Sequence, residues 1–186
     1  MRDWLQSLSG GDRRSIGQSN RVVGAVLANR RKFSALIDGL KADDYLIVMR
    51  CADAAEQVSR VHPEWLQRYG SILLDLASKV THQELRWHLA QMLPRLTLSA
   101  SERRRAIALM EEYLVDKSRI MQAFALQALA DFAAADTALR RRWLPRFEAI
   151  AHTGSPSSRA RARKVIAALQ RSHDTHSALS APRATP

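Results

Sequence analysis

Histidine and cysteine are the residue types of this chain that could hold a metal or act on a substrate. Two of the six histidines, His82 and His88, frame the stretch HQELRWH. They lie six residues apart, whereas two zinc ligands on one helical face need i, i+4 spacing, and the other histidines are dispersed. The amino-terminal glycines follow no predicted strand, so they do not form a phosphate-binding loop. We therefore expect no metal site and no cofactor.

The single cysteine, Cys51, lies in an apolar position, which favours a small buried side chain over a nucleophile. One cysteine also excludes an intramolecular disulfide. The amino terminus, MRDWLQSLSGGDRRS, contains no apolar segment typical of a secretory signal, and no window reaches the roughly 20 apolar residues of a membrane span. We expect a cytoplasmic protein that is not an enzyme and that does not enter a membrane.

The formal net charge of +11 raises the question of a polyanionic partner, because clustered Lys and Arg release counterions when they meet phosphates. The charge lies at the two ends of the chain. Residues 1–42 carry eight basic and three acidic side chains, residues 43–135 carry eleven and twelve, and residues 136–186 carry ten and three. This distribution argues against a continuous basic groove.

Two arginine runs near the carboxyl terminus are the strongest candidates for phosphate contacts. The run LRRRWLPRF surrounds Trp143 with arginines, and SSRARARK follows it. The candidate phosphate-binding residues are Arg141, Arg142, Arg159 and Arg163. The alternative is that a terminal repeat needs a polar outer face to remain soluble, and a run of charges is usually a solvated surface. Both interpretations stay open at this point.

A twelve-residue pattern occurs four times without gaps. The segments are IVMRCADAAEQV from Ile47, LRWHLAQMLPRL from Leu85, MQAFALQALADF from Met121 and SRARARKVIAAL from Ser158, and their starts lie 38, 36 and 37 residues apart. The first, fifth, eighth, ninth and twelfth columns are almost all apolar, and these columns share one face of a helix. The seventh column is polar in every copy. Each segment is therefore predicted to be an amphipathic helix in the same register.

Start signals and intervening segments extend the pattern to helical hairpins. Thr81 with Glu84 and Ser99 with Glu102 have capping-box spacing, and Ser155 precedes Pro156 as an N-cap precedes a first helical residue. Further amphipathic stretches cover residues 63–79, 99–115 and 136–152, and residues 20–28 and 32–40 form a divergent first pair. Pro94 should bend its helix or mark the last turn. We expect an N-terminal segment over 1–18, repeats over 19–171 and a disordered tail over 172–186.

The segments LRWHLAQML and SRARARKVI resemble the second helix of a HEAT repeat, and the resemblance covers about residues 43–170. The chain resembles small bacterial HEAT-repeat proteins. The resemblance implies an all-α, armadillo-like fold: a right-handed α-α superhelix, or α-solenoid, of about four helical hairpins whose second helices line the concave side. The second-column arginine of the family is present only as Arg86 and Arg159. The family's loop aspartate matches Asp44 and Asp116, so a ladder between repeats would be incomplete.

The implied function is a noncatalytic scaffold that binds another protein in its concave groove. The candidate groove residues project away from the apolar columns: Arg50, Asp53, Trp87, His88, Gln91, Phe124, Gln127, Arg161 and Lys164. Trp87 is either a binding anchor or packs against a neighbouring helix. His88 is more typical of a hydrogen-bonding residue in the groove than of a catalyst.

The alternative function is sequence-independent nucleic-acid binding through the basic carboxyl-terminal repeat. Some HEAT-like proteins are DNA alkylation-repair glycosylases, and others are bilin lyases. This chain matches no catalytic motif of either group, so neither resemblance implies catalytic residues here. Fold alone does not define function.

Overall fold

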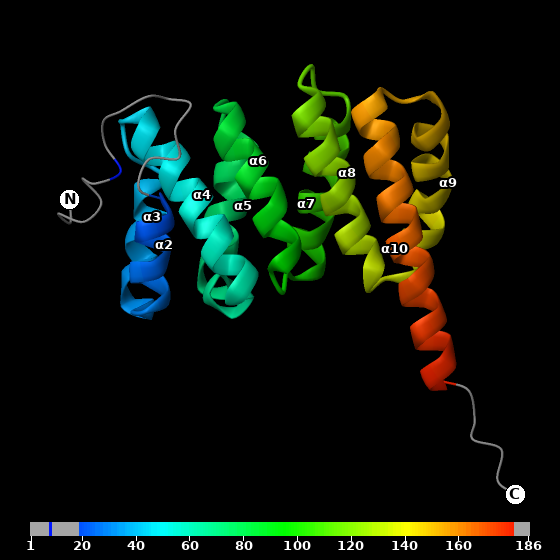
Figure 1. Cartoon of the computed structure of the whole chain (residues 1–186), viewed down its shortest axis with the longest axis horizontal. Helices are drawn as coiled ribbons and strands as arrows, with labels where there is room; N and C mark the ends of the chain where they lie inside the picture. Colours follow the sequence, from blue (N-terminus) through cyan, green and yellow to red (C-terminus); the bar gives the residue numbers. More distant parts are fainter. Residues whose placement is uncertain (1–7, 9–18, 181–186) are drawn as a thin grey trace, which may run out of the picture. The chain divides into compact units, whose positions relative to one another are not determined.

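The computed structural model describes residue 8 and residues 19–180, and it describes side chains through residue 171. All regular elements in these residues are helices, which confirms the all-α class (Figure 1). The α-helices are α2 (Ser19–Leu27), α3 (Phe33–Gly39), α4 (Tyr45–Val61), α5 (Gly70–Lys79), α6 (Gln83–Met92), α7 (Ala100–Leu114), α8 (Arg119–Ala134), α9 (Thr137–Thr153) and α10 (Pro156–Ser180). Four 3-10 turns complete them: η1 (Arg30–Lys32), η2 (Pro63–Trp65), η3 (Gln67–Tyr69) and η4 (Leu93–Arg95).

The chain divides into two compact units, Met1–Leu109 and Met110–Pro186, and the boundary lies inside α7. In the first unit, α4 packs against α2, α3 and α6, and α5 packs against α6. In the second unit, α8, α9 and α10 pack against one another. None of the described helices combines the length and the apolar character that crossing a bilayer requires.

The repeated register of the four segments is confirmed by burial. The segments lie on α4, on α6 with η4, on α8 and on α10. Nineteen of the twenty positions in the five apolar columns are buried, and Ile166 is the half-buried exception. Alternating the apolar columns with polar ones thus gives each helix a core face, as amphipathic periodicity predicts.

Helix starts follow local side-chain chemistry at most of the expected positions. Ser99 and Glu102 form the reciprocal capping box: the Ser99 amide donates to Glu102 Oε2 at 2.9 Å and the Glu102 amide donates to Ser99 Oγ at 3.3 Å. The Ser158 amide donates to Ser155 Oγ at 3.3 Å, and α10 begins at Pro156. The capping box expected at Thr81 is wrong, because α6 begins one residue later, after His82, without a side-chain cap.

Proline accounts for two departures from a plain α-helical hairpin. At Pro94, α6 changes into the 3-10 turn η4, so the residue marks the last turn of the helix as expected. The predicted helix over residues 63–79 begins instead with η2 and η3, and its α-helical part is α5. Pro63 can start a helical turn but supplies no amide to continue one from the preceding helix.

The carboxyl-terminal boundary also differs from the expected one. Helix α10 continues to Ser180, so the predicted end of the repeats at residue 171 falls inside it. Residues 157–181 contain neither proline nor glycine, and nothing in the backbone chemistry stops the helix there. The remaining residues of the predicted tail, 181–186, lie outside the described residues, as do residues 1–7 and 9–18 of the N-terminal segment.

Candidate functional site

The fourth-column arginine of the first repeat is buried, contrary to its expected place in a groove. Arg50 is 2 % exposed, and its Nη1 donates to the backbone oxygen of Leu8 at 2.6 Å. Its column flanks the core face, and the backbone of Leu8 lies against its guanidinium. A buried guanidinium needs such an acceptor because burial removes its water. Arg50 therefore links α4 to Leu8 through this hydrogen bond, and it is not part of the candidate binding surface.

The other first-unit candidates reach solvent only partly. Asp53, Trp87, His88 and Gln91 are all half-buried on α4 and α6. Asp53 Oδ2 accepts a hydrogen bond from Gln57 Nε2 at 2.9 Å, and Gln91 Nε2 donates to the backbone oxygen of Trp87 at 3.2 Å. Both polar side chains thus already bond within their own helices. Their positions form a partly sheltered, polar and aromatic patch.

His88 is the most perturbed titratable group of that patch. Its Nδ1 is buried and has no hydrogen-bond partner within the part of the chain that the structure describes. Desolvation lowers the pKa of His88, against the opposing charges of Asp53, Glu56 and Glu84 and with the charge of Arg60. The ring is therefore held neutral near pH 7. The hydrogen-bonding role expected for His88 is not seen at Nδ1.

The second-unit candidates connect α8 to α10. Phe124 and Gln127 are half-buried on α8, and Lys164 is exposed on α10. Gln127 Nε2 donates to Asp131 Oδ1 at 2.8 Å, while Gln127 Oε1 accepts from Arg161 Nη1 at 3.2 Å. Both the nitrogen and the oxygen of the Gln127 side-chain amide thus have hydrogen-bond partners. Of these candidates, Lys164 has the side chain most accessible to a partner.

A buried ion pair between consecutive repeats was missed by the sequence analysis. Glu56 of α4 is completely buried, and Arg95 of η4 donates to its Oε1 from Nη2 at 2.5 Å. Arg95 Nη1 also donates to the backbone oxygen of Glu56 at 3.0 Å and to Ser59 Oγ at 2.6 Å. Arg60 Nη2 approaches Glu56 Oε2 at 2.6 Å from the same helix.

The electrostatics of Glu56 follow from these neighbours. Burial alone would raise its pKa, but the hydrogen bonds and charges of Arg60 and Arg95 outweigh burial and hold the pKa below the usual range. Asp44 and Asp116, which the HEAT resemblance assigns to a ladder, instead accept the backbone amides of Leu46 and Ser118, both at 2.8 Å. The connection between repeats in the first unit uses Glu56 and Arg95.

The candidate phosphate-binding arginines fall into two groups. Arg142 pairs with Glu111 at 2.7 Å and lies over the Trp143 ring, 6.0 Å from its centroid. Arg141, Arg159 and Arg163 are exposed and have no ion pair with any described residue. Residues 156–171 of α10 contain no acidic side chain. Exposed arginines without an ion pair to any described residue therefore lie on both α9 and α10.

A cavity of about 260 Å³ at the α2–α3 and α4–α5 turns was also missed. Its lining combines three arginines with three aromatic rings and one serine: Arg30, Arg31, Phe33, Ser34, Trp65, Arg68 and Tyr69. The signal was present in the sequence as basic and aromatic residues interleaved in NRRKF and EWLQRY. Within the described residues, no three histidine, cysteine or acidic side chains gather as metal ligands would.

Comparison of the chain with protein-family models and with curated proteins finds no match.

Proposed function

We propose that this chain is a noncatalytic scaffold of HEAT-like repeats that binds another protein through its repeated second helices. The observation that carries the proposal is the register shared by α4, α6, α8 and α10. Their apolar columns are buried with one half-buried exception, whereas every seventh-column side chain reaches solvent at least partly. A helix that packs one face in a repeat core and keeps the other face polar leaves the polar face available for recognition.

The architecture we propose is a right-handed α-α superhelix. Its support is the recurrence of one register at nearly constant spacing, because repeats of this kind bury their apolar faces only against neighbouring repeats. Polar links between consecutive second helices are consistent with it. Arg95 to Glu56 is such a link in the first unit, and Arg161 to Gln127 is one in the second.

The proposed binding surface has one patch on each unit. The first patch comprises Asp53, Trp87, His88 and Gln91, and the second comprises Phe124, Gln127, Arg161 and Lys164. Each patch combines an aromatic side chain with hydrogen-bonding groups, the composition that protein interfaces favour. Arg50 is left out because it is buried.

Cys51 supports a proposed cytoplasmic location. Burial raises its pKa to about 12, so the side chain is a neutral thiol at physiological pH. A single buried thiol has no partner for a disulfide within the chain. Disulfides form and persist mainly in oxidising compartments, so a chain without a disulfide favours the reducing cytoplasm.

The test requires an identified partner and two matched variants. Proteins captured with the full chain would be purified, and their affinities would be measured by titration calorimetry. The patch variant combines Trp87→Ala, Gln91→Ala and Gln127→Ala. The control combines Ser71→Ala, Lys79→Ala and Arg104→Ala, all exposed and outside both patches.

We expect the patch variant to weaken binding at least about tenfold, which corresponds to roughly 1.4 kcal/mol, and the control to bind as the parent does. Circular dichroism would verify that both variants remain folded. Equal affinities of the patch variant and the parent would contradict the proposed surface.

A second candidate is sequence-independent nucleic-acid binding through the basic surface of α9 and α10. The observation that favours it is the exposure of Arg141, Arg159 and Arg163 without ion pairs among the described residues. Arginine at such a surface contacts phosphates without reading bases. Fluorescence anisotropy of labelled DNA and RNA tests this function.

The nucleic-acid measurement would run from about 50 to 200 mM salt, because phosphate contacts weaken steeply over that range. The variant combines Arg141→Gln, Arg159→Gln and Arg163→Gln, and it should lose most of the binding. Its control, Lys41→Gln, Lys79→Gln and Arg104→Gln, removes the same net charge from exposed positions of the first unit and should retain the binding. Absence of binding by the parent at low salt would rule this function out.

A further inference from the structure

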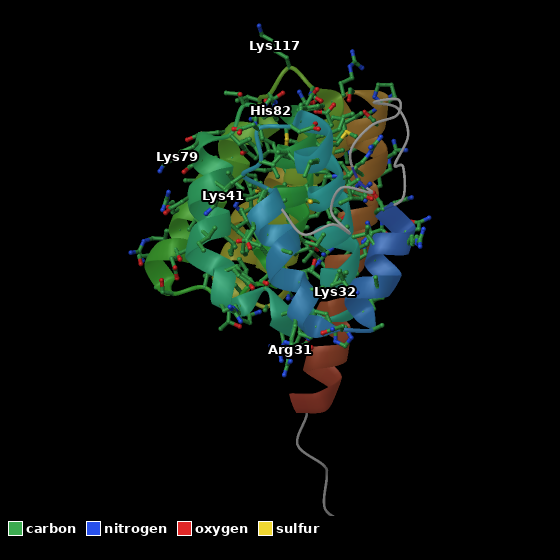
Figure 2. All side chains as sticks on the ribbon, turned by 90° about the vertical axis from the view of Figure 1, so that its left-hand side faces the viewer. Arg31, Lys32, Lys41, Lys79, His82 and Lys117 are labelled. Carbon is green, nitrogen blue, oxygen red and sulfur yellow. The ribbon has the colours of Figure 1, made fainter. Side chains whose placement is uncertain are left out.

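The cavity at the α2–α3 and α4–α5 turns is built from two segments that are distant in sequence. Residues 30–34 supply one wall from η1 and the start of α3, and residues 65–69 supply the other from η2 and η3. Arg31 and Lys32 lie at one end of the first unit, and Lys79 and His82 lie at the other (Figure 2). The cavity is therefore at the end of the first unit opposite Lys79 and His82, and its lining shares no residue with the polar patch of α4 and α6.

Three aromatic rings anchor the cavity walls. Phe33, Trp65 and Tyr69 are only 2, 8 and 8 % exposed. Phe33 meets the Trp65 ring edge-on at 5.8 Å and the Tyr69 ring at 6.0 Å. Aromatic pairs at such distances are attractive beyond the area they bury. The walls are thus held by core packing, which is how preformed ligand pockets are usually built.

Two of the three arginines are positioned by these rings. The Arg30 guanidinium lies 5.7 Å from the Trp65 ring centroid, and the Arg68 guanidinium lies 4.9 Å from that of Tyr69. Contacts between a cation and an aromatic face restrict an otherwise flexible side chain. The third, Arg31, follows the N-cap Asn29, whose Oδ1 accepts the Arg31 amide at 3.1 Å.

Among the described residues, the positive charge of the cavity is compensated only in part. Arg30, Arg31 and Arg68 have no ion pair with any residue among 19–171. Glu64 is the nearby acid: the charge of Arg30 is one of the causes that lower its pKa, but its carboxylate lies 3.0 Å from His62 Nδ1 and it is not part of the cavity lining. Three guanidinium groups around one small cavity match a doubly charged oxyanion better than a singly charged carboxylate.

We propose that this cavity binds the phosphate monoester of a small planar molecule. The arginines would hold the phosphate oxygens, because the guanidinium fork matches phosphate geometry. The planar group would contact the small exposed parts of Trp65 and Tyr69, because each of these residues is 8 % exposed and the Trp65 ring is already stacked on His62. The cavity volume of about 260 Å³ suits a phosphate with one ring rather than a polymer. This site is separate from the proposed protein-binding patches, and its test does not depend on them.

The experiment titrates the full chain with phenyl phosphate, inorganic phosphate and phenol, followed by two-dimensional NMR of backbone amides. We expect phenyl phosphate to give saturable shifts at Arg30, Arg31 and Arg68 and at the Trp65 indole. Inorganic phosphate should bind at least about tenfold more weakly, and phenol should not saturate the site at about 10 mM. Adenosine monophosphate and O-phosphotyrosine as further probes would separate a nucleotide from an aryl phosphate as the preferred source.

The variant Arg30→Gln, Arg31→Gln and Arg68→Gln should lose phenyl phosphate binding by at least about tenfold. The matched control, Lys41→Gln, Lys79→Gln and Arg104→Gln, removes the same charge at exposed positions outside every proposed site and should bind as the parent does. Equal losses of phenyl phosphate affinity in the two variants would mean that net charge alone causes the effect, and this result would contradict the proposed site. Absence of shifts in the parent would overturn it too, and equal binding of inorganic phosphate would overturn the role of the planar group.

Discussion

Arg95 Nη2 donates to Glu56 Oε1 at 2.5 Å, and this buried pair joins η4, at the end of α6, to α4. The carboxylate is completely buried, whereas the Arg95 side chain is 24 % exposed. Removing the water of a carboxylate is costly unless charged partners replace it. The stability of the first unit therefore depends on Arg95 more than its partial exposure would indicate.

The first prediction is that Arg95→Ala destabilises the protein by about 3 kcal/mol, because it leaves Glu56 with Arg60 as its remaining cation. Urea unfolding would measure the change. Arg60→Ala is the control: its side chain is 60 % exposed, so we expect a loss of at most about 1 kcal/mol. Arg60 contacts both carboxylate oxygens, but Arg95 also donates to the Glu56 backbone oxygen and to Ser59 Oγ. A smaller loss for Arg95→Ala than for Arg60→Ala would contradict the larger contribution that we expect of Arg95.

The second prediction concerns pH and His88. The pKa of His88 in the folded chain lies below its ordinary value of 6.5, so the unfolded chain binds this proton first as pH falls. Stability should therefore decrease below about pH 6.5, with a contribution of up to about 1.4 kcal/mol per pH unit, until the folded chain also takes up the proton.

Urea unfolding of the parent and of His88→Gln between pH 7.5 and 5, the range in which histidine titrates, checks the sign. The stability of His88→Gln should decrease less steeply with falling pH than that of the parent. His82→Gln, at an exposed position, is the control and should follow the parent. A decline that is unchanged in His88→Gln would mean that another group causes it.

The third prediction uses the repeated fifth and ninth columns. Leu89 and Leu129 are completely buried, and each truncation to alanine should cost about 2 to 5 kcal/mol through lost transfer energy and the remaining cavity. Ile120 is 51 % exposed, and Ile120→Ala should stay within about 0.5 kcal/mol of the parent. Thermal and urea unfolding would measure all three. Similar effects for Ile120 and Leu129 would contradict the register.

The register was predictable because helical periodicity is local. Each of the four segments contains enough residues to define its own apolar face, and the observed burial at Cys51, Leu89, Ala125 and Ala162 follows from that periodicity alone. Helix ends were less predictable. Thr81 has capping-box spacing with Glu84, but α6 starts after His82, since spacing does not specify the backbone dihedral angles of a cap.

The candidate site was less predictable because its chemistry depends on distant contacts. Arg50 is buried through an acceptor 42 residues away at Leu8, and the cavity brings Arg30 and Arg68 together across α3 and α4. Equivalent positions of the repeats carry no information on such pairs. Arg50 was therefore predicted to lie on a surface, and the arginines of the turns were not predicted to form a site.

The fourth prediction tests the closest approach of α3 to α4. A Cβ added at Gly39 would overlap Cys51 Sγ, because both residues lie in the buried contact between the two helices. Gly39→Ala should therefore destabilise the protein by about 1 to 3 kcal/mol, the usual cost of overpacking. Shortening the neighbour in the double variant Gly39→Ala, Cys51→Ala should recover part of this loss, with a coupling of about 1 kcal/mol.

The double-mutant cycle, measured by urea unfolding, separates a local clash from a general effect of alanine. Gly24→Ala is the matched control: an added Cβ there would meet no atom within 4 Å, and the exposed helix interior should gain up to about 1 kcal/mol. Strictly additive losses from Gly39→Ala and Cys51→Ala would contradict the contact. Recovery confined to the double variant would assign to Cys51 a packing role at the α3–α4 contact, which its buried, protonated thiol favours over a reactive one.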